Sequence, residues 1–303
     1  MKEIVLITGA SGTVAKVLEK KIEKEYSVRF LTRKKEHENE FEWNLKNKTI
    51  DEKAFENISH IIHLAGANIS EKRWTDERKK EIISSRVDSA KLILETLKKK
   101  NIKLKSFISA SAVGIYGAKT SEKIYSEDDE KGNDFLSEVV SLWEKAADEF
   151  HEKNVAERVV KIRTAIVLSE NEGALKKMAM PIKLGIGSPL GTGKQYMPWI
   201  HINDLSSVYE FALKNEKLSG AYNASAPQHT DNENITKEIA EVLKKPLFMP
   251  NVPGFVMKLI FGELAVALLE GSRTSSEKIQ KAGFEFEFPN LKKALENLLL
   301  KKN

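Results

Sequence analysis

The stretch Ile4–Leu18, which reads IVLITGASGTVAKVL, decides the fold of this chain. It opens with four apolar residues, a pattern typical of a strand buried in a parallel sheet. A turn of small residues follows, and apolar side chains then recur at helical spacing from Val14 to Ile22. Strand, glycine turn and helix in this order are the context that a dinucleotide fingerprint requires. Gly9 would allow the sharp turn, Gly12 would let the backbone approach a pyrophosphate, and the helix start would offer its N–H groups, so we expect nucleotide binding here.

The composition limits the class of protein. The chain has 303 residues, 41% of them hydrophobic, and its 49 basic residues are mixed among 44 acidic ones. This mixed charge predicts a solvated surface and argues against a nucleic-acid partner. There is no cysteine, which excludes disulfides, thiolate nucleophiles and cysteine–zinc sites. Apolar runs stay shorter than the roughly 18 to 20 residues that a bilayer requires, and the chain opens on strand residues without a signal peptide, so we expect a cytoplasmic protein with no membrane partner.

The second expected strand, residues 27–33, bears on the choice of cofactor. In a βαβ unit its end meets the adenosine ribose, where an acidic residue would bind the 2′-hydroxyl of NAD. This chain has Thr32 and Arg33 there, followed by two lysines. A guanidinium can pair with a 2′-phosphate through a forked geometry. We therefore predict NADP(H) as the cofactor, the alternative being that Arg33 belongs to a solvated basic loop.

Strands and helices alternate along the first half of the chain, which predicts a Rossmann-type, doubly wound parallel sheet of the α/β class. Further expected strands cover 58–64, 107–112 and 158–163, and long helices cover 75–100 and 135–153. We expect an NADP(H)-binding domain over 1–165, completed by sheet segments around 196–225. Residues 166–303 would form a smaller α+β domain on the substrate side, with helices near 234–243, 254–269 and 291–300.

Two features that resemble other sites are better explained structurally. His60 and His63 have an i, i+3 spacing on a strand, so their side chains face opposite sides and cannot share a metal ion. The glycine-rich segment 185–194 lacks the residue spacing of a phosphate-binding P-loop. We expect no metal site, and we interpret segment 185–194 as a loop on the substrate side.

Several long motifs, taken in order, resemble one known family. They read TGASGTVA, HLAGANI, RWTDERKKEIISSRV, SASAVGIYG, PLGTGKQYMPWIHINDL and AGFEFEFPNLKKAL. This order resembles the extended short-chain dehydrogenase/reductases (SDRs), and more narrowly their atypical "epimerase family" group, also named nucleotide-sugar epimerases. The resemblance runs from about Lys2 to Leu299. It implies a Rossmann domain that binds NADP(H) and a small C-terminal substrate domain.

The resemblance assigns cofactor-binding residues position by position. Gly9, Ser11, Gly12, Thr13 and Val14 match the pyrophosphate turn, Thr32 and Arg33 flank the 2′-phosphate, and Leu64, Ala65 and Gly66 match the turn beside the adenosine. Arg86 stands where extended SDRs often carry an asparagine near the phosphates, and it would add a charge-assisted contact there. Glu81, earlier on the same helix, would contact the cofactor or orient Arg86.

The catalytic positions match only in part. Ser111 matches the serine that hydrogen-bonds the reacting carbonyl or hydroxyl group in active relatives. Their partner motif is Tyr-x-x-x-Lys, in which tyrosine transfers the proton and lysine lowers its pKa. Here Leu136 and Val140 occupy those two positions, and the helix over 135–153 contains no tyrosine. Tyr116, close to the Ser111 loop, is a candidate acid or base, with aromatic packing as the alternative.

Tyr196 and His201 are further candidates for proton transfer. His201 lies beside Asn203 and Asp204, either of which would cap the helix that follows. A structural role near that cap is the preferred interpretation of His201.

Two classes of function remain open from the sequence. The first is an NADP(H)-dependent oxidoreductase or epimerase that acts on a hydroxyl or keto group of a small, sugar-like molecule. The alternative is a non-catalytic NADP(H)-binding sensor or regulatory module, since the fingerprint is intact while the dyad is missing. Many relatives pair as homodimers through the two long helices, here 75–100 and 135–153, so a homodimer is a further expectation.

Overall fold

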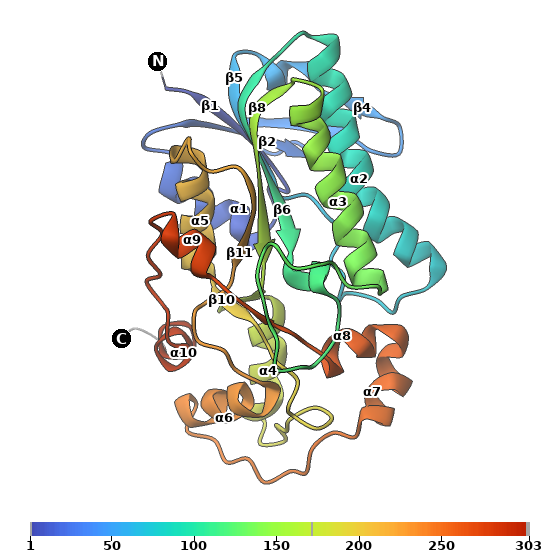
Figure 1. The fold of residues 1–303 in the computed structure, drawn as a ribbon, viewed down its shortest axis with the longest axis vertical. Coiled ribbons are helices and arrows are strands. Elements are labelled where there is room, and N and C mark those ends of the chain that lie inside the picture. Colours follow the sequence, from blue (N-terminus) through green and yellow to red (C-terminus); the bar gives the residue numbers. More distant parts are fainter. Residues whose placement is uncertain (1, 171, 301–303) are drawn as a thin grey trace.

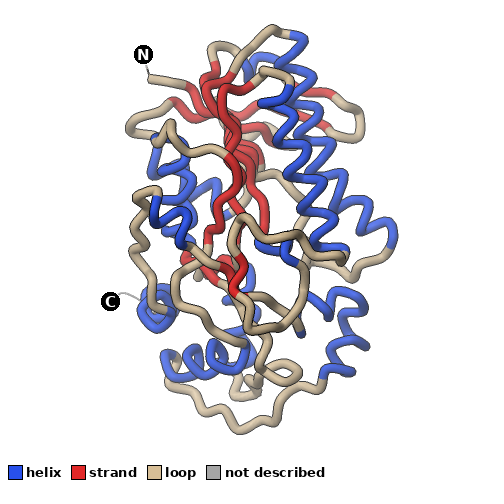
Figure 2. Tube along the Cα trace, viewed as in Figure 1, coloured by secondary structure: helices blue, strands red, loops and turns tan. Residues whose placement is uncertain are grey.

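An eight-stranded sheet lies at the centre of the computed structural model, which describes residues 2–170 and 172–300 (Figures 1 and 2). Its order is β11-β8-β6-β5-β1-β2-β3-β4, parallel throughout except for the antiparallel β3–β4 pair. The strands are β1 (Ile4–Thr8), β2 (Ser27–Thr32), β3 (Glu40–Asn44), β4 (Thr49–Ile50), β5 (Ile58–His63), β6 (Leu104–Ala112), β8 (Ala156–Thr164) and β11 (Gly220–Ala224). The chain leaves β1 toward β2 and later returns to pair β5 on its other side, so the strand order reverses at β1. In open α/β sheets such a reversal is where ligands bind. The Rossmann-type architecture predicted from the sequence is confirmed.

Two pairs of helices cover the sheet (Figure 1). Helices α1 (Thr13–Ile22) and α5 (Ile202–Lys214) pack on one face, and α2 (Asp76–Lys99) and α3 (Phe135–Glu152) pack on the other. Strand β1 is apolar on both sides because helices cover both faces of the sheet. Val5 and Ile7 belong to the core beneath α1 and α5, whereas Leu6 belongs to the core beneath α2 and α3. Alternation along a strand turns successive side chains to opposite faces, so a doubly covered strand must be apolar throughout.

The remaining elements lie mostly beyond the carboxyl ends of the central strands, and several of them share a separate core (Figures 1 and 2). They are β7 (Ile124–Tyr125), β9 (Ile166–Leu168), α4 (Gly173–Lys183), β10 (Trp199–His201), α6 (Asn232–Val242), α7 (Gly254–Phe261), α8 (Ala265–Leu269), β12 (Arg273–Thr274), α9 (Glu277–Lys281) and α10 (Leu291–Leu299). Short 3₁₀ turns complete the fold: η1 (Glu52–Phe55), η2 (Val113–Tyr116) and η3 (Gly262–Leu264). Strand β9 pairs with β10, and β7 with β12. Within the two described ranges, no helix has both the length and the apolar character that crossing a bilayer demands.

Two local expectations were wrong. The single helix expected over 254–269 is broken at Gly262, whose φ of +60° lies in the left-handed region, into α7, η3 and α8. The expected helix caps Asn203 and Asp204 are also not the caps. The N-cap of α5 is His201, whose Nδ1 accepts the N–H of Asn203 at 3.0 Å. The Asp204 carboxylate instead accepts the backbone N–H groups of residues 287 and 288.

Candidate functional site

The turn between β1 and α1 has the tight geometry expected of a dinucleotide fingerprint. Gly9 has a φ of +78°, and a Cβ there would lie 3.2 Å from the carbonyl carbon of Leu64. The N–H of Gly12 donates to the carbonyl oxygen of Gly9 at 2.9 Å. Only glycine combines this backbone angle with so close an approach, so the turn is pressed against the end of β5.

The start of α1 is built to receive an anion. Its N-cap, Gly12, has no side chain to accept the N–H groups of the first turn, and that turn carries no acidic residue. Ser11 is exposed beside it, and Thr13 and Val14 are the first two helical residues. Unpaired N–H groups and the positive end of the helix dipole together favour a phosphate. The hydroxyl of Thr13 donates to Glu172 at 2.5 Å.

Thr8 joins the ends of β1 and β5, a role that sequence reasoning missed. Its hydroxyl accepts the N–H groups of Leu64 and Ala65, each at 3.0 Å, and lies 2.9 Å from His63 Nδ1. Burial lowers the pKa of His63 to about 4, so this ring is neutral at physiological pH. The described residues hold no cluster that could bind a metal ion, and His63 serves to fix the β5 turn.

Arg86 lies directly against that turn. A Cβ on Gly66 would come within 3.0 Å of the Arg86 guanidinium carbon, so glycine makes room for this side chain. Arg86 is 9% exposed, and its guanidinium donates to the carbonyl oxygen of Ile82 at 3.0 Å and stacks on the ring of Trp143, 4.9 Å from the ring centre. Within the described residues it forms no ion pair with a carboxylate. Burial, followed by repulsion from Arg78, lowers its pKa to about 10.

Glu81 does not orient Arg86, contrary to one of the two roles expected for it. Its carboxylate pairs with Arg78 at 2.5 Å instead. Arg78 also donates to Glu71 and to the carbonyl oxygen of Asn68, so its charge is balanced locally. Of the two buried arginines on α2, Arg86 is therefore the one whose charge lacks a carboxylate in the part of the chain that is described.

The carboxyl end of β2 presents the residues predicted to meet the ribose. Thr32 ends the strand and donates through its hydroxyl to the carbonyl oxygen of Lys34 at 3.1 Å. Arg33 follows and is exposed, and it takes part in no ion pair among the described residues. Its guanidinium is thus available for a ligand.

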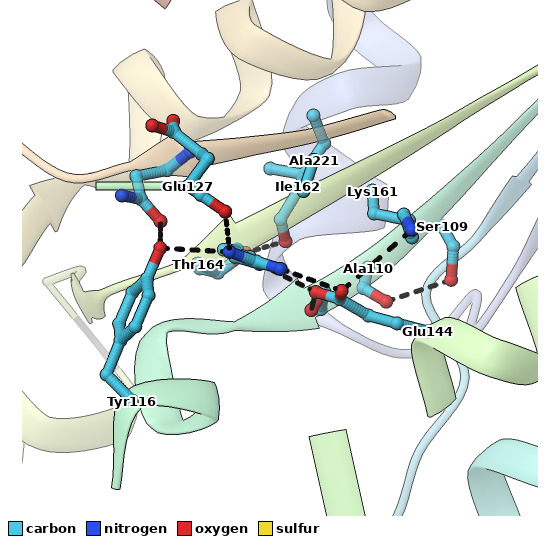
Figure 3. A network of polar contacts seen from close by, with 12 residues as sticks. Ser109, Ala110, Tyr116, Glu127, Glu144, Lys161, Ile162, Thr164 and Ala221 are labelled. Atoms are coloured by element: carbon cyan, nitrogen blue, oxygen red, sulfur yellow. Dashed lines mark hydrogen bonds and ion pairs between the residues drawn. The ribbon is translucent and has the colours of Figure 1, made fainter. Parts of the chain in front are cut away.

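Ser111 lies near the end of β6 in a buried polar network, of which Figure 3 labels Glu144 and Tyr116. Its hydroxyl donates to Glu144 at 2.6 Å, and the same carboxylate pairs with Arg163 through both of its oxygens, at 2.8 and 3.0 Å. Although burial opposes the charge, the guanidinium of Arg163 and the hydroxyl of Ser111 hold the pKa of Glu144 below its ordinary value. Arg163 was not singled out from the sequence, where only its position at the end of an apolar strand marks it.

Tyr116 belongs to the same network (Figure 3). It is 2% exposed, and its hydroxyl donates to Asn223 at 2.8 Å and accepts from Arg163 at 3.0 Å. Its ring stacks on that of Tyr125. Burial raises the pKa of Tyr116 to about 12. This geometry agrees with the packing alternative, because both hydrogen-bonding directions of the hydroxyl are already used.

The positions of the missing dyad face the end of β6. A Cβ on Gly114, in η2, would lie 3.6 Å from Leu136 Cβ and 3.9 Å from a methyl group of Val140. Apolar side chains therefore stand at both positions. The other candidates are engaged elsewhere: Tyr196 donates to Glu122 at 2.8 Å, and His201 caps α5.

Two family profiles match successive segments of the chain. The profile of the NAD dependent epimerase/dehydratase family matches residues 5–225, and that of a domain of unknown function (DUF1731) matches residues 252–298. Epimerase family protein SAR0825 of Staphylococcus aureus (strain MRSA252) is 36% identical over 300 residues, covering 98% of this chain and 99% of that protein. Epimerase family protein SDR39U1 of Mus musculus is 34% identical over 243 residues, 79% of this chain and 81% of that protein.

A solved structure resembles the whole chain. The crystal structure of the human epimerase family protein SDR39U1 (isoform2) with NADPH superimposes with a TM-score of 0.86 at 28% identity, covering 97% of this chain and 98% of that one.

Proposed function

Because this chain belongs to the NAD dependent epimerase/dehydratase family, as an atypical SDR of the epimerase group, we propose that it binds NADP(H) and acts on a hydroxyl or keto group of a small, sugar-like molecule. The family as a whole binds a nicotinamide dinucleotide, and a relative of similar structure was crystallised with NADPH. The finer choice of the phosphorylated cofactor rests on the residues of this chain.

One observation carries the proposal: Arg86 is a buried guanidinium without a carboxylate partner among the described residues, beside the glycine turn of β5. A buried charge is costly unless an opposite charge joins it. The anion that fits is a phosphate of the cofactor held between Arg86 and the start of α1. The exposed Arg33 at the end of β2 would hold the 2′-phosphate.

When bound, NADP(H) supplies or takes up a hydride. The chain's own contribution is to bind and orient: the turn from Gly9 to Val14 receives the pyrophosphate. Ser111 donates its hydroxyl hydrogen to Glu144 and so offers its oxygen as an acceptor to a substrate hydroxyl group. No Tyr-x-x-x-Lys pair is present to move the proton, so turnover would lack acid–base help worth typically 10²–10⁴-fold.

Titration of the protein with NADPH and NADH, followed by nicotinamide fluorescence, tests the cofactor preference. We expect NADPH to bind at least about tenfold more tightly, since one charge-assisted contact contributes about 1.5–3 kcal/mol. Arg33→Ala should remove most of that preference. Lys34→Ala is the matched control, because Lys34 is 82% exposed and pairs with Glu36 at 3.5 Å. Equal affinities in the parent protein would refute the choice of NADP(H).

A second function, a non-catalytic sensor or regulatory module that binds NADP(H), is favoured by Leu136 and Val140 at the dyad positions. Incubation of the protein with NADPH and a panel of carbonyl compounds, followed by nicotinamide absorbance, separates the two functions. Turnover that Ser111→Ala abolishes supports the enzyme. Tight NADPH binding without turnover on any compound supports the module.

A further inference from the structure

Glu172 places a carboxylate at the start of α1. It is the N-cap residue of α4, yet its side chain does not cap that helix. It accepts the hydroxyl hydrogen of Thr13 instead, at 2.5 Å, although the two residues are 159 positions apart. Glu172 is exposed and forms no ion pair within the described residues. Its carboxylate is thus directed toward the first residue of α1 rather than toward its own helix.

Helix α4 contacts two segments that the proposed function places beside the cofactor, namely α1 and the connection between β5 and α2. On one side, Val14 and Val17 of α1 pack against the core that contains Leu175 and Ala179 of α4. On the other side, Lys177 donates to the carbonyl and hydroxyl oxygens of Ser70, between β5 and α2, at 3.2 and 3.3 Å. Packing and hydrogen bonds therefore fix where Glu172 lies.

A helix start attracts a negative group, and nothing within α1 supplies one. Gly12 offers no capping oxygen, and the first turn has no acidic residue. A carboxylate from another helix interacts favourably with this helix start in the same way as a phosphate does. We propose that Glu172 competes with the diphosphate of the cofactor for the start of α1 and so sets the affinity for NADP(H). This inference rests on the proposed function, and it deepens that function by naming a residue that weakens cofactor binding.

The proposed competition predicts that Glu172 weakens cofactor binding. Binding of the diphosphate requires the bond from Thr13 to Glu172 to break, and it brings like charges together if the carboxylate stays in place. Both effects oppose binding, so removal of the carboxylate should strengthen it. This is the reverse of the usual result of deleting a polar side chain from a binding site.

The experiment compares the full-length parent protein with Glu172→Ala, Glu172→Gln and the matched control Glu170→Gln, a nearby exposed carboxylate. Kd values for NADPH come from fluorescence titration, and thermal unfolding without ligand verifies that each variant is folded. We expect Glu172→Ala to lower Kd about tenfold, equivalent to about 1.4 kcal/mol. Glu172→Gln should lower it less, since an amide oxygen still accepts from Thr13, and Glu170→Gln should leave it unchanged. An unchanged or raised Kd in Glu172→Ala overturns the proposal, as does an equal gain in Glu170→Gln.

Inorganic diphosphate separates this inference from the proposed function. A parent protein that binds neither NADPH nor NADH refutes the proposed function. In that case the rise in melting temperature caused by diphosphate decides the matter. A larger rise in Glu172→Ala than in the parent and in Glu170→Gln supports the competition, and an equal rise overturns it.

Discussion

Replacement of Arg86 by methionine should weaken cofactor binding without destabilising the free protein. The guanidinium is buried against Gly66 and Trp143, and it has no carboxylate partner in the described part of the chain. Its pKa lies at about 10, below the ordinary 12.5, because burial disfavours the charged form. Because the pKa of Arg86 is lower in the folded protein than in the unfolded chain, the positive charge at neutral pH decreases the free energy of unfolding. Methionine keeps much of the side-chain volume and removes that charge.

The magnitudes follow from the contacts. A lowering of the pKa from 12.5 to about 10 corresponds to a penalty of about 3 kcal/mol for holding the charge. Methionine relieves it, but it loses the hydrogen bond to Ile82, about 1 kcal/mol, and the stacking on Trp143, about 1 kcal/mol. The net change in unfolding free energy is therefore close to zero or slightly stabilising. Cofactor binding loses a charge-assisted contact of about 1.5–3 kcal/mol, or about 10- to 100-fold in Kd.

The assay pairs urea unfolding of the free protein with NADPH titration, and Arg78→Met serves as the control. Arg78 is buried on the same helix but pairs with Glu71 and Glu81, so its loss should lower stability and change Kd by less than about threefold. The reasoning is refuted if Arg86→Met unfolds at clearly lower urea while its Kd for NADPH equals that of the parent. That result would mean that Arg86 supports the fold rather than the ligand.

Two further predictions concern buried groups. Glu144→Ala should lower the free energy of unfolding, measured in urea, by about 3–5 kcal/mol, because it leaves the guanidinium of Arg163 buried without its partner. A decrease of less than about 1 kcal/mol would contradict a stabilising role of this ion pair. His63 has a pKa of about 4 in the folded protein and about 6.5 when unfolded, so the unfolded chain binds the proton first as the pH falls. The contribution of His63 to the free energy of unfolding is therefore complete above about pH 6.5 and falls by about 3 kcal/mol as the pH decreases to 4. His63→Gln should remove this decrease from the profile of unfolding free energy against pH.

The fold was predictable where the apolar pattern is unambiguous. The βα unit from Ile4 to Ile22 and the helices α2 and α3 agree with the prediction to within a residue or two, because each buries a continuous apolar face. Strands β3 and β4 were not predicted, since charged residues surround the packed Trp43 at the edge of the sheet. The break at Gly262 was missed because an apolar run continues on both sides of it.

The cofactor side of the site was easier to anticipate than its polar contacts. The glycine turn predicts the role of Gly9, since backbone geometry restricts which residues fit there, whereas the roles of Gly66 and Arg86 were expected from the family resemblance. The contact of Thr13 with Glu172 spans 159 positions and depends on how α4 packs on α1. One of the two roles expected for Glu81, the orientation of Arg86, disagrees with helix spacing. Arg78 lies three positions away, within reach along a helix, whereas Arg86 lies five positions away on a different face.

The absence of the dyad leaves the turn between β1 and α1 unchanged for a physical reason. Helix α3 is held on the sheet by the pair between Glu144 and Arg163 and by its apolar stripe, in which Leu136 and Val140 pack beside η2. Neither set of contacts needs a tyrosine or a lysine. The turn that starts at Gly9 is braced from β5, on another strand. Binding of the dinucleotide and transfer of the proton are thus supported by separate contacts, which is why the sequence predicts the ligand more firmly than the reaction.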